Sequence, residues 1–270
     1  MAVRSPVSKG RSPEAWDLAA ERVVAKPYLD PLVAAAKRRA HLSLLERWLP
    51  PLDGMAVLKT DLWEEGIGGD ELLFTLARRA GSATGVDISP RVVAAARERA
   101  AVPGVELRLA EADLLEGLPF AAGEFDAVVS TSTIDHLDSG HEHRFALAEL
   151  RRVLVDGGTL VVTVDNRDNA FDWLLRAANS LGGVPFPLRE GPTLDELREL
   201  VVDAGFRAEE HEYLVPAPRV LATAAVRLAR RLPDRAAERA VSGLLRSFDA
   251  LGQRAPRRLG SFVALRALAI

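Results

Sequence analysis

The chain has 270 residues, of which 48% are hydrophobic and 27% are charged, and its net charge is −3. These values are typical of one globular domain, with or without appendages, and they argue against a general affinity for nucleic acid. The absence of cysteine excludes disulfides, thiolate metal sites and cysteine nucleophiles. No apolar run reaches the roughly eighteen residues that span a bilayer, and no signal peptide is recognisable, so we expect a cytoplasmic protein.

Residues 1–12 lack any hydrophobic periodicity, and we expect them to be disordered. Helical spacing of apolar residues, ended by Pro50 and Pro51, predicts N-terminal helices within residues 13–50. Strands and helices then alternate. The predicted strands are residues 55–58, 83–86, 105–109, 125–130, 159–164, 207–214 and 260–267. The predicted helices between them are residues 70–79, 90–101, 141–154 and 194–204.

This alternation predicts an α/β fold, a doubly wound and mostly parallel seven-stranded sheet whose core comprises residues 51–215 and 258–270. Residues 216–257 are interpreted as a helical insert that caps the site, with breaks at Pro233 and Gly243. Residues 219–258 contain ten arginines against three acidic residues, a net charge of +7. This segment is either a solvated surface or a contact for an anionic substrate or a membrane.

A glycine-bearing turn and a carboxylate indicate a nucleoside site. Glu65, Gly66 and Gly68 lie between the first predicted strand and the following helix, and Asp87 ends the second strand about twenty residues later. In α/β sheets such glycines let the backbone approach the ligand, and the carboxylate accepts hydrogen bonds from ribose hydroxyls. The sequence therefore predicts an enzyme that uses a nucleoside cofactor.

The order of the remaining motifs resembles the Rossmann-like (class I) methyltransferases that use S-adenosylmethionine, of the small-molecule type. The resembling segments are Val86-Asp87-Ile88-Ser89, Glu111-Ala112-Asp113-Leu114, Phe125-Asp126-Ala127-Val128-Val129-Ser130, Asp135-His136-Leu137 and Leu150-Arg151-Arg152-Val153-Leu154. The resemblance covers residues 55–214 and 260–267. It implies that Asp87 and Ile88 bind the ribose, that Asp113 and Leu114 lie near the adenine, and that Ser130 borders the cofactor.

The first motif departs from the family pattern, because Lys59 stands where the family carries an acid and the loop before the glycines is longer. In one interpretation, Lys59 pairs with the cofactor carboxylate while Asp61 or Glu65 faces its ammonium group. In the other, the site has diverged and no longer binds the cofactor.

The resemblance implies that Asp135 and His136 are the candidate catalytic pair, because many small-molecule members carry an acid and a histidine at this place. His136 also follows the fourth strand, where substrates lie in open α/β sheets. A histidine can take a proton from an acceptor hydroxyl or amine. His141 and His143 lie nearby, but the spacing matches no familiar zinc signature, and we expect no metal.

The predicted function is S-adenosylmethionine-dependent O- or N-methylation of a small-molecule acceptor, in natural-product, lipid or sugar biosynthesis. The alternative is a non-methylating protein on the same scaffold, either a cyclase-like enzyme or an inactive binding subunit. An NAD-dependent dehydrogenase fits less well, because the glycine turn is not G-x-G-x-x-G. The sequence leaves open whether the protein forms a homodimer.

Overall fold

The computed structural model describes residues 12–25, 29–69, 71–100, 106–138, 140–181, 188–217 and 219–270. The expected disorder of residues 1–12 therefore falls, apart from Ser12, outside the described residues. Within the described ranges, no helix is both long enough and apolar enough to cross a membrane.

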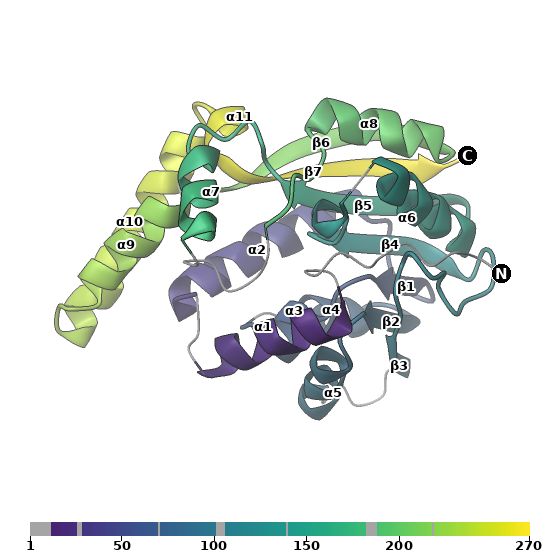
Figure 1. Cartoon of the computed structure of the whole chain (residues 1–270), viewed down its shortest axis with the longest axis horizontal. Helices are drawn as coiled ribbons and strands as arrows, with labels where there is room; N and C mark the ends of the chain where they lie inside the picture. The colour runs from purple at the N-terminus through teal and green to yellow at the C-terminus, as the bar shows by residue number, and fades with distance from the viewer. Residues whose placement is uncertain are drawn as a thin grey trace.

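A single sheet organises the described part of the chain (Figure 1). Its strands are β1 (Ala56–Lys59), β2 (Ser82–Asp87), β3 (Glu106–Glu111), β4 (Phe125–Thr131), β5 (Leu154–Asp165), β6 (Phe206–Pro216) and β7 (Gly260–Ala269). The order across the sheet is β3-β2-β1-β4-β5-β7-β6. Strands β1 to β5 pair in parallel, whereas β7 runs antiparallel between β5 and β6. The predicted mostly parallel seven-stranded sheet is confirmed.

The helices flank this sheet on both faces. They are α1 (Pro13–Ala25), α2 (Pro31–Trp48), α3 (Trp63–Gly66), α4 (Leu72–Ala77), α5 (Pro90–Arg99), α6 (Gly140–Val153), α7 (Asp172–Ser180), α8 (Leu194–Asp203), α9 (Arg219–Ala229), α10 (Asp234–Gly252) and α11 (Pro256–Leu259), with a 3₁₀ turn at Ile134–His136. Helices α6 and α8 cover one face, and α2, α4 and α5 cover the other. Successive side chains of β1 point to opposite faces of the sheet, so Leu58 packs with α6 and α8 while Val57 packs with α2.

Local sequence chemistry places the helix starts where they were predicted. The Ser89 hydroxyl accepts a hydrogen bond from the Val92 amide at 3.1 Å, and Pro90 occupies the first helical position of α5. Thr193 and Glu196 form the predicted capping box at the start of α8. These caps fix where each helix leaves the sheet, and they confirm the two corresponding predictions.

Two local predictions were wrong. The helix expected over residues 70–79 is shorter and is preceded by the unpredicted helix α3, so Gly66 ends a helix instead of lying in a turn. A side chain at Gly66 would come within 2.6 Å of the Val92 carbonyl oxygen, so this glycine permits close packing of α3 on α5. Gly243 does not break the insert but lies inside α10, because packing of that helix offsets the roughly 1 kcal/mol cost of an interior glycine.

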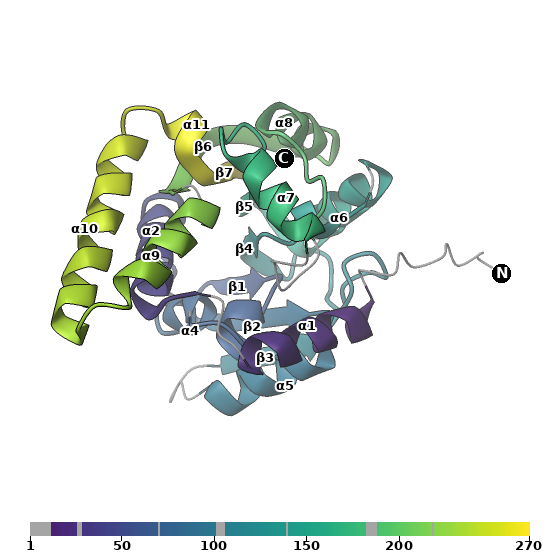
Figure 2. The same ribbon diagram turned by 60° about the vertical axis from the view of Figure 1, so that its left-hand side comes forward.

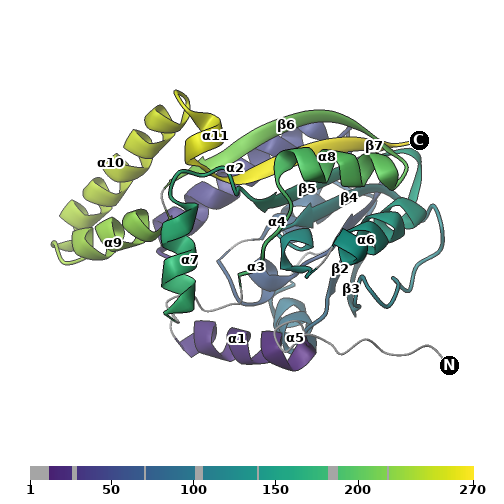
Figure 3. The ribbon, with the colours of Figure 1, turned by 45° about the horizontal axis from the view of Figure 1, so that its top comes forward.

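The topology brings the strand ends that carry the predicted site residues to one edge of the sheet. The carboxyl ends of β1 to β5, the end of β6 and the start of β7 meet at one edge of the sheet. Helices α1, α7 and α9 lie over this edge (Figures 2 and 3). Any ligand bound there is therefore enclosed by the sheet edge and by helices from both ends of the chain.

Candidate active site

A cavity of about 800 Å³ opens at this edge, within the range of small-molecule and cofactor sites. Its lining comes from α1, α2, α7 and α9, from the carboxyl ends of β1 to β6, and from the first residues of β7. The predicted site residues that line it are Lys59, Asp61, Asp87, Ile88, Asp113, Leu114, Asp135 and His136. The structure thus brings eight of the twelve predicted residues to one cavity.

The carboxylate of Asp87 is held in a fixed orientation at the end of β2. Its Oδ1 atom accepts a hydrogen bond from the Ser89 amide and its Oδ2 atom one from the Leu62 amide, both at 2.9 Å. Burial raises the pKa of Asp87 to about 7, although these two hydrogen bonds act to lower it. Each oxygen keeps a lone pair that a ligand hydroxyl can use.

Helix α1 covers this end of the cavity. Its Asp17 accepts a hydrogen bond from the Ser89 hydroxyl at 2.5 Å, which ties α1 to the first turn of α5. The ring of Trp16 makes T-shaped contacts with the rings of Trp63 and His136, with centroid distances of 5.6 and 4.8 Å. An N-terminal helix therefore forms part of the wall beside Asp87.

Lys59 lies in a buried ion-pair cluster. Its Nζ atom donates to Asp61 Oδ2 at 2.8 Å and to Glu65 Oε2 at 3.0 Å, and its side chain is only 1% exposed. Burial would lower the pKa of Lys59, but the two carboxylates outweigh this effect and raise it. The cation is already paired within the protein. This geometry does not support the predicted pairing of Lys59 with a cofactor carboxylate.

Asp61 is the member of this cluster that is open to the cavity. Its side chain is 19% exposed, and its Oδ2 atom also accepts from the Thr131 hydroxyl at 2.6 Å. Burial would raise the pKa of Asp61, but the ammonium of Lys59 outweighs this effect and lowers it. Asp61 therefore presents a carboxylate, in its charged form, to the cavity.

Four predicted cofactor residues do not line the cavity: Glu65, Gly66, Gly68 and Ser130. The fully buried Glu65 accepts a hydrogen bond from the Leu73 amide at 2.7 Å, and burial raises its pKa to about 7. A side chain at Gly68 would collide with Glu64, and the hydroxyl of Ser130 accepts a hydrogen bond from Thr60. These residues therefore contact neighbouring protein groups and not the cavity, and they help to hold the loop that follows β1 in place.

Asp135 and Asp165 lie together on the opposite wall. Asp135 Oδ2 accepts a hydrogen bond from the Asp165 amide at 2.8 Å, whereas the buried Oδ1 atom has no partner among the described residues. Burial raises the pKa of Asp135 to about 6, with the negative charge of Asp165 adding to the rise and His136 opposing it. A side chain at Gly191 would come within 2.5 Å of the Asp135 Cβ atom, so a glycine packs behind this carboxylate. The oxygen without a partner is suited to a ligand hydroxyl or amine.

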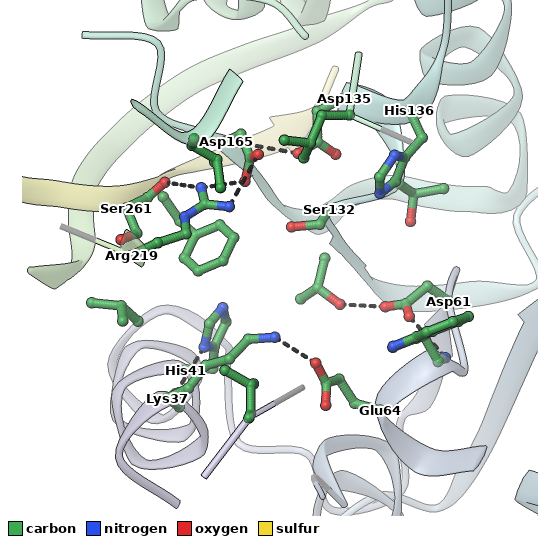
Figure 4. Close-up of a pocket in the computed structure, with 18 of the residues that line it drawn as sticks. Lys37, His41, Asp61, Glu64, Ser132, Asp135, His136, Asp165, Arg219 and Ser261 are labelled. Carbon is green, nitrogen blue, oxygen red and sulfur yellow. Dashed lines mark hydrogen bonds and ion pairs between the residues drawn. The ribbon is translucent and has the colours of Figure 1, made fainter. Parts of the chain in front are cut away.

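Sequence reasoning missed the wall formed by α2 and β7 (Figure 4). The Nδ1 atom of His41 hydrogen-bonds the Lys37 carbonyl oxygen at 2.9 Å, and burial lowers the pKa of His41 to about 4. The imidazole is therefore neutral near pH 7, and its Nε2 atom is a hydrogen-bond acceptor. The Lys37 ammonium and the Arg219 guanidinium both lie over the Phe262 ring, at 5.6 and 4.7 Å from its centroid. No sequence motif marks these residues, because distant segments bring them together.

Helix α9 is fixed at both ends by arginine–carboxylate pairs. At its start, Arg219 bonds both oxygens of Asp165, at 2.6 and 3.2 Å. At its end, Arg230 bonds both oxygens of Asp30, at 2.6 and 2.9 Å. Bidentate pairs of this kind fix orientation as well as distance. The first helix of the predicted insert thus lies along the same cavity as Asp87 and His136.

Sequence comparison now places this geometry among known proteins. Residues 63–162 match the family described as methyltransferase domain. The chain is 36% identical to the malonyl-[acyl-carrier protein] O-methyltransferase of Geobacter sulfurreducens over 186 residues, which are 66% of this chain and 65% of that protein. It is 41% identical to the demethylmenaquinone methyltransferase of Thermus thermophilus over 97 residues, 35% of this chain and 42% of that protein. The chain thus matches less than two thirds of the length of either relative.

The fold as a whole is shared with a solved structure, the [4+2]-cyclase SpnF, with a TM-score of 0.60 at 18% identity over 98% of this chain and 99% of that chain. The sheet order, the antiparallel last strand and the cavity at the carboxyl edge define a Rossmann-like methyltransferase fold. Together with the match of residues 63–162 to a methyltransferase domain, they support the resemblance to the Rossmann-like S-adenosylmethionine-dependent methyltransferases. The resemblance seen in the sequence is confirmed.

Proposed function

We propose that this protein binds S-adenosylmethionine in the cavity and transfers its methyl group to an oxygen or nitrogen of a small-molecule acceptor. The orientation of Asp87 carries the proposal, because two backbone amides aim a carboxylate into the cavity at the strand end where the family binds ribose. When bound, the cofactor supplies a methyl group on a positively charged sulfur.

The chemistry of the lining fits that cofactor. Asp61, Asp87 and Asp113 all line the cavity. The groups that the cofactor offers in the corresponding places are an ammonium, two ribose hydroxyls and an adenine amine, and all of them are hydrogen-bond donors. We propose that Asp61 accepts the ammonium, Asp87 the ribose and Asp113 the adenine amine, while Ile88 and Leu114 add apolar contacts. Lys59 then acts indirectly, by keeping Asp61 charged and in place.

The acceptor would occupy the part of the cavity between α7, α9 and the Asp135 wall. Leu175, Val220, Val226 and Phe262 make much of this region apolar. We propose that Asp135 and His136 orient a hydroxyl or amine of the acceptor and take its proton as it is methylated. Methyl transfer needs mainly alignment and exclusion of water, which α1 and α9 provide by covering the cavity.

The shared fold of a cyclase shows that this scaffold also serves non-methylating chemistry. A binding measurement and an activity measurement together separate the two proposals. S-adenosylhomocysteine at a hundred times its dissociation constant is expected to stabilise the protein by about 2.7 kcal/mol in a thermal melt. No stabilisation would contradict cofactor binding. Stabilisation without methyl transfer from labelled S-adenosylmethionine to any member of a broad panel of phenols, carboxylates and amines would favour the cyclase-like or binding role.

The pKa of Asp87 predicts a pH dependence of cofactor binding. Hydrogen bonds from two ribose hydroxyls require the charged carboxylate, but the raised pKa leaves Asp87 largely protonated below about pH 7. The affinity for S-adenosylhomocysteine should therefore fall as the pH drops below about 7, by up to tenfold per pH unit. Titration calorimetry across this range would measure it. Glu65 and Asp135 also titrate near these values. An Asp87→Asn variant should bind S-adenosylhomocysteine weakly, and its affinity should depend less on pH. An unchanged pH dependence would mean that another group, and not Asp87, causes it.

A further inference from the structure

The hairpin of α9 and α10 projects from the body of the molecule, and its tip comprises residues 227–239 (Figures 1 and 3). Two large apolar side chains at this tip are open to solvent, Leu228 at 64% and Leu232 at 48% exposed. Apart from Arg230, the exposed arginines at the tip are Arg227, Arg231, Arg235 and Arg239. Among the described residues, none of these four arginines forms an ion pair.

An exposed leucine on its own is ordinary, but here leucines and arginines alternate on one short segment. The tip has five arginines against two acidic residues, Asp234 and Glu238, and one of the five, Arg230, is bound to Asp30. Leucine side chains can enter the acyl boundary of a bilayer, while arginines pair with its phosphates. A nucleic acid would use only the charge and leave the leucines in water. We propose that this tip docks on an anionic lipid bilayer.

The position of the cavity suggests what the docking achieves, namely access for an acceptor from the bilayer. This step rests on the proposed function. The half of α9 next to the tip contributes Val226 and Arg227 to the cavity lining, to which Leu29, just before α2, and Val33 of α2 also contribute. The cavity therefore extends along α9 toward the tip, where its wall combines these apolar side chains with the ion pair of Arg230 and Asp30. An acceptor with a long apolar portion, dissolved in the bilayer, would enter beside the docked tip.

Vesicle flotation with the full chain tests the docking without any acceptor or cofactor. The protein is mixed with vesicles of phosphatidylcholine alone or of phosphatidylcholine with phosphatidylglycerol. We expect flotation with the anionic vesicles only. Raising the salt from about 0.1 M to about 1 M shortens the screening length from about 10 Å to about 3 Å and should release the protein. No flotation, or flotation that ignores lipid charge and salt, would overturn the proposal.

Two double variants test the tip itself. Leu228→Ser with Leu232→Ser removes the apolar contacts, and Arg231→Glu with Arg235→Glu reverses the charge. Each pair is expected to lower the partition coefficient on anionic vesicles at least tenfold. Thermal melts should show that both variants remain folded, because these side chains are exposed.

The other end of α10 offers matched controls. Leu251 is 50% exposed, and Arg246 and Arg254 are exposed on the same hairpin away from its tip. Leu251→Ser and Arg246→Glu with Arg254→Glu should leave vesicle binding within about twofold of the original. Equal losses of vesicle binding in the control and tip variants would mean that net charge or general hydrophobicity causes the binding. That result would overturn the proposal that the tip is the docking site. So would a dimer, seen by light scattering and disrupted by the tip variants, in a protein that does not bind vesicles. Loss of methyl transfer is not a readout here, so failure of the docking leaves the proposed function standing.

Discussion

Replacing Lys59 by methionine is expected to destabilise the fold by about 3–5 kcal/mol. The substitution leaves Asp61 and the fully buried Glu65 facing each other without the cation that compensates them. In a chain of this size each kcal/mol lowers the melting temperature by roughly 2–4 °C. Thermal or urea unfolding of the variant would measure the loss.

Lys37→Met provides a matched control, because the pair of Lys37 with Glu64 is partly exposed, at 21% and 14% of the two side chains. Its loss should cost about 1 kcal/mol or less. A second variant, Lys59→Met with Glu65→Gln, should recover part of the stability by removing one of the orphaned charges. Equal stability of the two single lysine variants would contradict the buried cluster.

Asp87→Ala is expected to weaken the binding of S-adenosylhomocysteine by about ten- to a hundredfold. The reason is the loss of a charge-assisted hydrogen bond to the ribose, worth roughly 1.5–3 kcal/mol. The variant should also melt earlier, because the amides of Leu62 and Ser89 lose their acceptor. Calorimetry well below the melting temperature separates the loss of affinity from the loss of stability.

Glu111→Ala is the control for Asp87. Glu111 lies opposite Asp87 in the register of β2 and β3, but it is exposed and does not line the cavity. Its removal should leave the affinity unchanged. An unchanged affinity in a folded Asp87→Ala protein would refute the ribose assignment.

Much of the sheet could be predicted because β1, β4, β5 and β7 contain short apolar runs and β3 alternates apolar and charged residues. The strand-end rule placed Asp87 and His136, since residues that follow parallel strands meet at one edge, whereas Asp113 and Asp135 were implied by the resemblance to the family. Applied consistently, this rule would also have found Asp165, which ends the fifth strand. Strand-end chemistry is therefore the part of a site that a sequence shows best.

The pairing of Lys59 with neighbouring carboxylates could not be predicted from its position at the end of a strand. Whether a cation binds a ligand or a neighbouring carboxylate depends on the path of the following loop, and here the short helix α3 returns Glu65 to the lysine. Four residues carry too little periodicity to predict such a helix. His41 and Lys37 were missed for a different reason, since α2 precedes the sheet in the sequence and reaches the cavity only through tertiary packing.

The connection between the last two strands has a consequence for how this protein can change. Pro216 and Gly260 are paired neighbours in the antiparallel ladder of β6 and β7, so the segment that contains α9, α10 and α11 leaves and rejoins the sheet at adjacent points. Topologically it is an enlarged hairpin loop, and lengthening such a loop costs little free energy of closure. The strand ends that hold Asp61, Asp87 and Asp113 all precede it. We therefore expect that changes in this segment would alter the proposed acceptor region and leave the residues proposed to bind the cofactor unchanged.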